Sequence, residues 1–332
     1  MKINYFFRSN QAGYSIQSVF NTILNSIGKR FTIRSTYLPS PFASIVAIFK
    51  NGLYAHQRQE KNEINHITGD VHYLLYFLNA KRTVVTVHDI MYYHYLKGIK
   101  KIIWKWIYID SLKRASRVTF ISEFAKNQIL DEIDLPAERI CVIPNPVDPS
   151  FVYSPKTFNE KQPRILHIGT LERKNLNRTI RALKGITCHL RIIGTLDDAT
   201  RSLMSDLGIV YSSASSLTHE QIVSEYQQAD IINFPSTFEG FGMPIIEGQA
   251  TGRLVITSNL SPMKEVAGEG AMLVDPYSVE DIRKAYINII NNPSLRKSLV
   301  KKGLENVQKY QVEHITAQYV NIYISITNEN PD

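Results

Sequence analysis

Short apolar runs rich in β-branched residues alternate with longer stretches of helical periodicity through most of the chain. The pattern predicts strands at residues 2–7, 83–87, 118–121, 140–143, 164–168, 189–193, 231–234, 254–257 and 271–274. Between the strands it predicts helices, for example at residues 175–184, 220–229 and 278–291. Apolar strands separated by helices are typical of parallel sheets buried on both faces, so we expect an α/β fold of two doubly wound, Rossmann-like domains.

A proline-rich stretch marks the boundary between the two predicted domains. Five of the chain's 14 prolines fall between residues 144 and 163, and proline opposes helix and withholds an amide donor. We expect an N-terminal domain at residues 1–150, a C-terminal domain at residues 151–310, and a C-terminal helix and tail at residues 311–332. Because ligands bind at the carboxyl ends of strands in such folds, we expect the domains to face each other across a cleft.

Composition narrows the class of protein. The 332 residues are 44% hydrophobic and 20% charged, which is typical of globular domains rather than of a disordered or disulfide-rich chain. The sequence contains no apolar run of about 18 residues, and its N-terminus lacks the apolar core of a signal peptide. Two distant cysteines, Cys141 and Cys188, suit a reducing compartment. We therefore expect a cytoplasmic protein.

The positive charge is concentrated in the first half of the chain. Residues 1–160 hold 20 Lys and Arg against 12 Asp and Glu, whereas residues 161–332 hold 18 of each. Seven basic residues and one acid lie within residues 95–117, where Lys97, Lys101 and Lys105 recur at helical spacing. Such a basic amphipathic segment is typical of contact with an anionic membrane. A helix packed on the core with solvated lysines is the alternative.

The segment at residues 234–252 (FPSTFEGFGMPIIEGQATG) is the most informative part of the chain. A strand ends at Phe234, two glycines follow, and Pro244 is well placed as the first residue of a helix whose amides would bind a phosphate. Glu239 precedes the turn and Glu247 is expected in the first turn of the helix, so both carboxylates suit a ligand with sugar hydroxyls. The alternative is a solvated Glu239 and a Glu247 stabilised only by the helix dipole.

Two further segments place charged or titratable side chains at strand ends. Residues 164–175 (RILHIGTLERKN) predict a strand, a glycine turn and a helix start, with two adjacent cations, Arg173 and Lys174, that could stabilise negative charge on a ligand. Residues 83–89 (TVVTVHD) predict a buried strand that ends in His88. A bare pair of cations is usually a solvated surface, and a lone histidine is more often structural.

These motifs resemble those of the retaining glycosyltransferases of family 4, which have the GT-B fold. The resemblance covers about residues 83–325 and rests on the two glutamates, Glu239 and Glu247, and on the glycine and Arg-Lys-Asn element. It implies two Rossmann-like domains facing each other across a cleft, with the C-terminal helix returning to the N-terminal domain. It also implies a metal-independent reaction without a further cofactor, and the sequence contains no Asp-x-Asp triplet.

The resemblance assigns a role to each candidate residue. Glu239 contacts the transferred sugar, Glu247 holds the ribose, and Arg173 and Lys174 meet the diphosphate, with the main contact left open between the two. His88 lies near the reacting sugar. The diphosphate or sugar is approached by loop and helix-start residues, namely Gly13 in the N-terminal domain and Gly240, Phe241, Gly242, Met243 and Pro244 in the C-terminal domain.

The sequence therefore predicts a retaining hexosyltransferase that uses a nucleoside diphosphate sugar, with GDP-mannose as the first candidate donor. The predicted acceptor is a glycan or a lipid-linked oligosaccharide of a bacterial surface polysaccharide, such as O-antigen, capsule or lipopolysaccharide. The predicted location is the inner face of the plasma membrane, with residues 95–117 on the anionic surface. The alternatives are another activity on the same fold, such as a nucleotide-sugar epimerase, and a basic nucleic-acid-binding protein. The neutral second half argues against a nucleic-acid partner.

Overall fold

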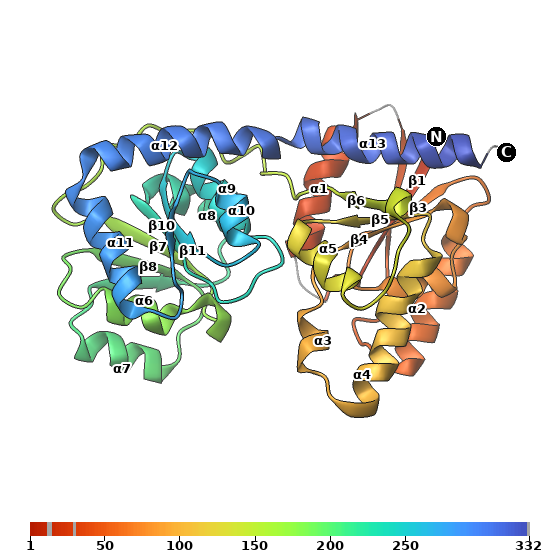
Figure 1. Ribbon diagram of the computed structural model, residues 1–332, viewed down its shortest axis with the longest axis horizontal. Helices are drawn as coiled ribbons and strands as arrows, with labels where there is room; N and C mark the ends of the chain where they lie inside the picture. Colours follow the sequence, from red (N-terminus) through yellow and green to blue (C-terminus); the bar gives the residue numbers. More distant parts are fainter. Residues whose placement is uncertain (12–14, 29–30, 331–332) are drawn as a thin grey trace. The chain divides into compact units, whose positions relative to one another are not determined.

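The computed structural model describes residues 1–11, 15–28 and 31–330. The chain divides into two compact units, one formed by Met1–Pro146 with Val312–Asp332 and the other by Val147–Gln311. Within the described residues, each unit is built on one parallel sheet of six strands with helices packed on its faces (Figure 1). The α/β class with two doubly wound sheets is therefore confirmed.

The sheet of the first unit has the strand order β2-β1-β3-β4-β5-β6, and all neighbouring strands are parallel. Its strands are β1 (Lys2–Phe7), β2 (Thr32–Tyr37), β3 (Ile64–Ile67), β4 (Thr83–Val87), β5 (Arg117–Phe120) and β6 (Ile140–Val142). The order reverses at β1, which lies between β2 and β3. Ligands bind doubly wound sheets at such a switch point, outside the carboxyl ends of the strands.

The helices of the first unit include the C-terminal helix of the chain. They are α1 (Ser15–Ile27), α2 (Ile45–Arg58), α3 (Met91–Tyr95), α4 (Gly98–Trp104), α5 (Glu123–Leu130) and α13 (Val312–Glu329). Helix α13 packs against α1 and β3. The hydroxyl of Tyr323 on α13 lies 2.8 Å from the hydroxyl of Tyr5 and 2.6 Å from Nδ1 of His66, and all three side chains are buried. The C-terminal helix thus returns to the N-terminal unit, as the resemblance implied.

The sheet of the second unit has the strand order β12-β11-β10-β7-β8-β9. Its strands are β7 (Arg164–Ile168), β8 (His189–Ile193), β9 (Tyr211–Ala214), β10 (Ile231–Phe234), β11 (Leu254–Ser258) and β12 (Met272–Val274). Strand β7 lies between β8 and β10, so the order reverses there. The loops that follow β7 and β10 therefore leave the sheet at its switch point.

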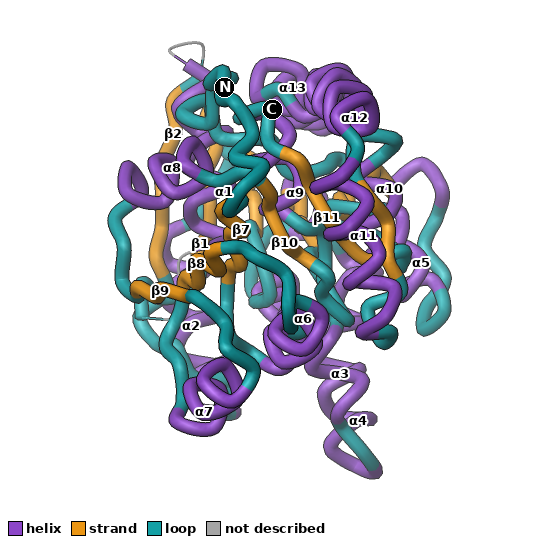
Figure 2. Tube along the Cα trace, turned by 90° about the vertical axis from the view of Figure 1, so that its left-hand side faces the viewer, coloured by secondary structure: helices purple, strands orange, loops and turns teal. Residues whose placement is uncertain are grey.

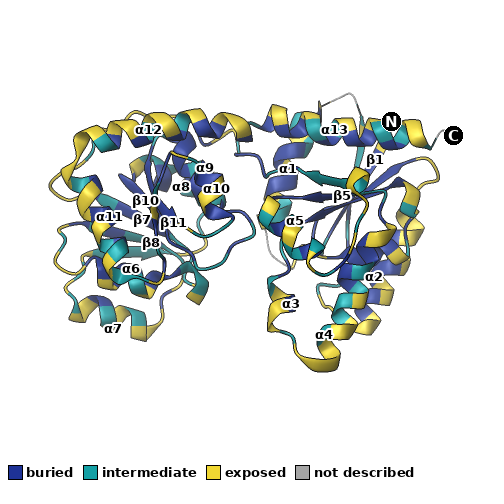
Figure 3. Ribbon diagram, viewed as in Figure 1, coloured by how far each residue is buried: buried dark blue, intermediate teal, exposed yellow. Residues whose placement is uncertain are grey.

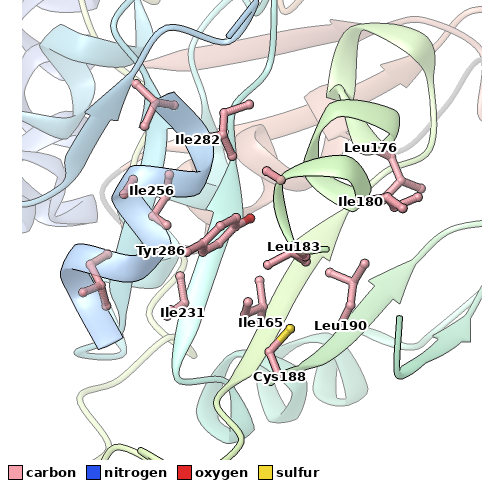
Figure 4. Packing of buried hydrophobic residues seen from close by; sticks show 14 of the residues in the cluster. Ile165, Leu176, Ile180, Leu183, Cys188, Leu190, Ile231, Ile256, Ile282 and Tyr286 are labelled. Atoms are coloured by element: carbon pink, nitrogen blue, oxygen red, sulfur yellow. The ribbon is translucent and has the colours of Figure 1, made fainter. Parts of the chain in front are cut away.

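The core of the second unit joins helices to the sheet. Its helices are α6 (Leu176–Ala182), α7 (Asp198–Asp206), α8 (His219–Gln228), α9 (Met243–Ala250), α10 (Met263–Ala267), α11 (Val279–Asn291) and α12 (Pro293–Val307). Ile180 of α6 and Tyr286 of α11 pack with Ile165, Leu190 and Ile231 of the strands in one fully buried cluster (Figure 4). Removal of this apolar surface from water is the main term that stabilises the unit.

The sequence analysis did not predict three of the described strands, β2, β3 and β9. Strand β3 carries Asn65 and His66, both fully buried, so its residues do not form an apolar run. Every residue of β9 is only partly buried, because this strand lies at an edge of its sheet. Hydrophobic periodicity predicts a strand only where apolar residues form its buried face, and these three strands lack that pattern.

Residues 95–117 do not form one continuous helix. Helix α3 ends at Tyr95, and α4 begins at Gly98, whose φ of +56° breaks the helical path. A π-helical turn (Lys105–Ile109) and a 3₁₀ turn (Asp110–Arg114) follow. Helix α4 buries none of its residues and projects away from the sheet of its unit (Figure 2); its residues are exposed or partly exposed (Figure 3). The alternative of a helix packed on the core is therefore wrong for α4.

Candidate functional site

The loop between β10 and α9 carries Glu239. Gly242 ends this loop as the N-cap of α9 with a φ of +115°, and a Cβ at this position would lie 2.9 Å from Ile245 Cδ1. The turn therefore requires glycine. Pro244 is the second residue of the helix rather than the first, which corrects the expected boundary by one residue. Glu239 lies at the carboxyl end of the sheet and is only 9% exposed.

The loop between β7 and α6 carries the two cations. Gly169 follows β7 with a φ of +89°, and a Cβ there would lie 3.0 Å from Lys174 Cγ, so the glycine leaves room for the lysine stem. Asn175 precedes α6 in the left-handed conformation, and its Nδ2 donates to the carbonyl oxygen of Pro235 at 2.9 Å. This hydrogen bond ties the loop after β7 to the loop after β10.

Arg173 and Lys174 converge on Glu239. Nη1 of Arg173 lies 2.8 Å from Oε2 of Glu239, and Nζ of Lys174 lies 2.7 Å from Oε1. Two cations thus share one carboxylate, and the cluster carries net positive charge close to the N-terminus of α9, where the helix dipole adds to it. The structure brings together these three residues, which the sequence placed at separate strand ends.

Lys174 is a partly desolvated cation. Its ammonium lies 4.6 Å from the ring centroid of Phe234, which is a cation–π geometry. Burial lowers the pKa of Lys174, and the carboxylate of Glu239 acts in the opposite direction. Attraction between charges is stronger in such surroundings than in water. An anion that contacts Lys174 is therefore attracted more strongly than it would be in water.

Glu247 lies in the second turn of α9, so the expectation of a position in the first turn is wrong. Its Oε2 accepts a hydrogen bond from the hydroxyl of Tyr226 on α8, a residue that is fully buried. Burial raises the pKa of Glu247 to about 7, whereas the hydrogen bond from Tyr226 lowers it. The sequence analysis did not single out Tyr226, because a tyrosine at the apolar positions of a helix reads as an ordinary core residue.

The remaining donor-binding candidates open α9. The ring of Phe241 is 4% exposed and packs edge to face on Tyr310, with the ring centroids 5.7 Å apart. A ligand can therefore meet Phe241 through its backbone rather than its ring. Met243 and Pro244 are partly exposed at the helix start, and Gly240 lies between Glu239 and Phe241.

His88 follows β4 in the first unit. Its Nε2 donates to the carbonyl oxygen of Thr68 at 2.8 Å, which leaves Nδ1 as an acceptor in the neutral ring. Burial lowers the pKa of His88, which favours this neutral form. Asp89 accepts a hydrogen bond from the amide of Met91 at 2.9 Å, just before the short helix α3. Gly13, the candidate of the preceding loop, lies outside the described residues.

In the part of the chain that the structure describes, no group of three or more His, Cys, Asp and Glu side chains is positioned to hold a metal ion. Cys141 and Cys188 are free thiols. Burial raises the pKa of both, to about 11 for Cys188, so both are protonated at neutral pH and are poor nucleophiles.

The surface around α4 combines apolar side chains with lysines. Ile99, Ile102 and Trp106 are 73%, 68% and 62% exposed, and Lys97 and Lys100 are exposed beside them. Across residues 1–11, 15–28 and 31–330, no helix has both the length and the apolar character that crossing a membrane requires.

The three lysines that recur at helical spacing, Lys97, Lys101 and Lys105, do not form one exposed row. Lys105 forms an ion pair with Glu132, at 3.0 Å between Nζ and Oε2. The ammonium of Lys101 lies 4.4 Å from the ring centroid of Tyr93. Both lysines are therefore held against the unit by these contacts.

A second exposed apolar surface lies at the start of α2, and the sequence analysis missed it. It comprises Phe42, Ile45, Val46, Phe49 and Leu53, which are between 56% and 78% exposed. An apolar face on a helix normally packs on the core, so its exposure can be recognised only in the folded chain.

Two family models match consecutive parts of the chain. The model described as Glycosyltransferase Family 4 matches residues 24–151, and the model described as Glycosyl transferases group 1 matches residues 153–306. The chain belongs to the family 4 glycosyltransferases. The family expected from the motifs is thus confirmed, and its first model reaches well into the N-terminal region where the motifs were weak.

The curated relatives of this family 4 chain include mannosyltransferases. It is 28% identical over 222 residues to the O-antigen chain mannosyltransferase RfbU of Salmonella typhimurium, and the match covers 64% of this chain and 62% of the relative. It is 27% identical over 250 residues to the O-antigen chain mannosyltransferase B of Escherichia coli, and this match covers 65% of this chain and 63% of the relative. The chain therefore spans less than two thirds of the length of these relatives.

Solved structures support the fold. A sucrose-phosphate synthase from Thermosynechococcus elongatus matches with a TM-score of 0.81 and 17% identity, over 99% of this chain and 100% of the other. WaaG, a glycosyltransferase involved in lipopolysaccharide biosynthesis, matches with a TM-score of 0.74 and 13% identity, over 97% and 99%. The GT-B fold is therefore confirmed for this family 4 glycosyltransferase.

Proposed function

We propose that the chain is a retaining, metal-independent hexosyltransferase. It transfers a hexose, with mannose as the first candidate, from a nucleoside diphosphate sugar to a hydroxyl of a glycan or a lipid-linked oligosaccharide. The product belongs to a bacterial surface polysaccharide such as O-antigen, capsule or lipopolysaccharide. The choice of mannose and of this product class is supported by the names of the curated relatives, two of which are O-antigen chain mannosyltransferases.

The observation that carries the proposal is the shared ion pair of Arg173 and Lys174 with Glu239. A diphosphate presents more negative charge than one carboxylate, so it competes for both cations when it enters the site. Glu239 is then free to accept hydrogen bonds from hydroxyls of the donor sugar. One cluster thereby provides the contacts for both parts of the donor.

The cations also explain how the reaction proceeds without a metal. As the bond between the anomeric carbon and the phosphate oxygen breaks, negative charge grows on the diphosphate, and Arg173 and Lys174 stabilise it together with the N-terminus of α9. The acceptor oxygen forms the new bond on the same face of the sugar. Its proton passes to the departing phosphate oxygen, so the step needs no basic side chain.

The other candidate residues complete the donor contacts. Glu247 accepts hydrogen bonds from the ribose hydroxyls, and the backbone of Gly240, Phe241, Gly242 and Met243 meets the diphosphate or the sugar, with Pro244 fixing the start of α9. His88 accepts a hydrogen bond from the sugar through Nδ1, because Nε2 is occupied by Thr68.

The same proposal places the protein at the cytoplasmic surface of an anionic membrane. The exposed apolar side chains of the surface around α4, Ile99, Ile102 and Trp106, would insert into the membrane interface. The exposed Lys97 and Lys100 would meet lipid phosphates. The exposed residues at the start of α2 add apolar surface within the same unit. A peripheral attachment of this kind suits an acceptor carried by a membrane lipid.

The proposal is tested with a panel of nucleoside diphosphate sugars. A donor at about 100 times its dissociation constant adds about 2.7 kcal/mol to the stability of the folded chain, which a thermal shift detects. Transfer from the stabilising donor to a glycan is then measured for the wild type, for Arg173→Ala and for Glu239→Ala. We expect both variants to fold and to lose transfer, while the exposed control Arg181→Ala keeps it. Full turnover by both site variants would refute the site assignment.

A further inference from the structure

A basic cavity lies at the amino edge of the first sheet, the opposite end of the strands from the edge where doubly wound folds bind their ligands. It has a volume of about 320 Å³. Its lining holds four cations, Lys81, Arg114, Arg117 and Arg139, against one carboxylate, Glu329. The described lining therefore carries a net charge of +3.

Three neighbouring strands bring these cations together. Strands β4, β5 and β6 are adjacent and parallel. A 3₁₀ turn that contains basic residues at its end precedes each of them, namely Ala80–Arg82, Asp110–Arg114 and Ala137–Arg139. Neighbouring strands lie about 4.8 Å apart, so the starts of β4 and β6 are about 10 Å apart. This is about one Debye length at an ionic strength of about 0.1 M, so the cations can act on one ligand together.

The arginines of the two outer turns keep hydrogen-bond donors that a ligand can reach. Nε of Arg114 donates to the carbonyl oxygen of Leu75 at 3.1 Å, and Nη1 of Arg139 donates to the carbonyl oxygen of Lys113 at 3.3 Å. Both Nη atoms of Arg114, and Nε and Nη2 of Arg139, have no partner among the described residues. Arg114 is exposed and Arg139 is partly exposed, so these donors face accessible space.

Three of the four cations lack a carboxylate partner. Glu329, at the end of α13, pairs with Arg117, and its side chain is 49% exposed. In the part of the chain that the structure describes, no other carboxylate lies within ion-pairing distance of a cation of this cavity. Like charges that share one edge repel one another, and an anion that binds among them removes this repulsion.

The cavity also accounts for part of the charge that is concentrated in residues 95–117. Arg114 and Arg117 belong to this segment, but they follow α4 and the π-helical turn and lie next to the start of β5. They are therefore separate from Lys97 and Lys100, which lie at the start of α4. The basic residues of the segment are thus divided between two surfaces of the first unit.

We propose that this cavity binds the phosphate group of a small phosphorylated compound or of a phospholipid head group. A phosphate carries up to two charges, and its oxygens accept paired hydrogen bonds from guanidinium groups. A neutral ligand would leave the cations uncompensated. The volume lies at the lower end of the range for small-molecule sites, which favours a phosphate ester over a whole nucleotide sugar. The inference goes beyond the proposed function, whose donor cluster belongs to the second unit.

Binding is tested by calorimetry with inorganic pyrophosphate as the probe. The full chain carries Arg173→Ala, which removes a cation of the proposed donor site. We expect a dissociation constant of about 1 mM or less, and Arg114→Met and Arg139→Met should each weaken binding about tenfold. The exposed control Arg58→Met should bind as the parent chain does. No binding, or equal binding by Arg114→Met, Arg139→Met and Arg58→Met, would overturn the assignment.

Glu329 provides a test in the opposite direction. Its carboxylate competes with the phosphate for Arg117, so Glu329→Gln should tighten pyrophosphate binding about threefold. The replaced side chain is half exposed at the end of a helix, and we therefore expect the variant to fold. Weaker binding by Glu329→Gln would contradict the inclusion of Arg117 in the site.

The source of the phosphate is distinguished with two further probes, glycerol 3-phosphate in solution and vesicles that contain phosphatidic acid. Both are used with the Lys97→Glu and Lys100→Glu chain, in which the contribution of α4 to vesicle binding is reduced. If adding Arg114→Met and Arg139→Met lowers vesicle binding about tenfold, the ligand is a lipid head group. Unchanged vesicle binding with loss of glycerol 3-phosphate would assign a soluble compound. No loss with either probe would overturn the phosphate site.

Discussion

Nζ of Lys174 lies 2.7 Å from Oε1 of Glu239, although the two residues are 65 positions apart in the chain. They meet because the loops after β7 and β10 leave neighbouring strands at the switch point of the second sheet. Arg173 holds the other oxygen of the same carboxylate. Glu239 therefore has two cationic partners, and the proposed donor would compete with Glu239 for both of them.

Glu239→Gln separates the two roles of the glutamate. The amide cannot neutralise Arg173 and Lys174, so we expect free GDP or UDP to bind about tenfold more tightly than to the wild type. Transfer should fall by about a hundredfold or more, because the sugar loses its charged acceptor. Calorimetry with the free nucleotides measures the first effect and product formation the second. Weaker nucleotide binding in Glu239→Gln would show that the exchange does not occur.

The raised pKa of Glu247 predicts a pH-dependent stability. Its pKa in the folded chain is about 7 against 4.5 for an ordinary glutamate, so the folded state holds the proton more tightly than the unfolded state. The group therefore costs stability as the pH rises from about 4.5 to about 7, by up to about 3 kcal/mol. Glu247→Gln should match the wild type at pH 4.5 and exceed its stability at pH 8. Urea unfolding at both pH values measures the difference, with the exposed Glu280→Gln as the control that should show none.

Tyr226 is a positioning residue for Glu247. Its hydroxyl hydrogen bond favours the ionised carboxylate, Lys174 acts in the same direction, and burial and Asp148 oppose them. If ionised Glu247 holds the ribose, donor affinity rises through pH 7, and Tyr226→Phe should move the midpoint upward by about one pH unit. Nucleotide titrations between pH 6 and pH 9 test this shift. An unchanged midpoint with uniformly weaker binding would mean that Tyr226 only supports the packing.

If the protein attaches to a membrane as proposed, we expect the attachment to depend on Lys97 and Lys100, two exposed lysines at the start of α4. Lys97→Glu with Lys100→Glu should reduce binding to anionic vesicles by about tenfold or more, because each lysine near such a surface contributes about 1 kcal/mol. The matched control is Lys184→Glu with Lys297→Glu, which makes the same charge change in the second unit. Co-sedimentation with vesicles measures both. Equal binding by the two double variants would show that α4 does not form the contact.

The sequence predicted those parts of the fold that a pattern of neighbouring residues identifies. Strand β4 is buried along its whole length and reads as an apolar run, and the glycine turns around Glu239 and Lys174 were read directly from residue types. Strand β3 was missed because its buried Asn65 and His66 look polar in sequence. Asp70, which follows β3, was consequently not recognised at the carboxyl edge.

The sequence predicted which residues belong to the candidate site but not which of them contact one another. The motif identified Glu239 and Glu247, whereas the ion pairs of Glu239 and the hydrogen bond from Tyr226 arise from strand order, which links residues far apart in the chain. The lysines of residues 95–117 were placed by helical spacing, and the break at Gly98 invalidates that spacing. The contacts of Lys101 with Tyr93 and of Lys105 with Glu132, which the spacing cannot show, decide which lysines are exposed.

The most direct test of the central claim is the anomeric configuration of the product. An α-linked nucleoside diphosphate hexose is incubated with the full chain and a glycan acceptor, and the new linkage is determined by NMR. We predict an α-linked product that appears with the wild type and the Arg181→Ala control and is lost in Arg173→Ala and Glu239→Ala. A β-linked product, or transfer that survives in both site variants, would contradict a retaining reaction supported by Arg173, Lys174 and Glu239.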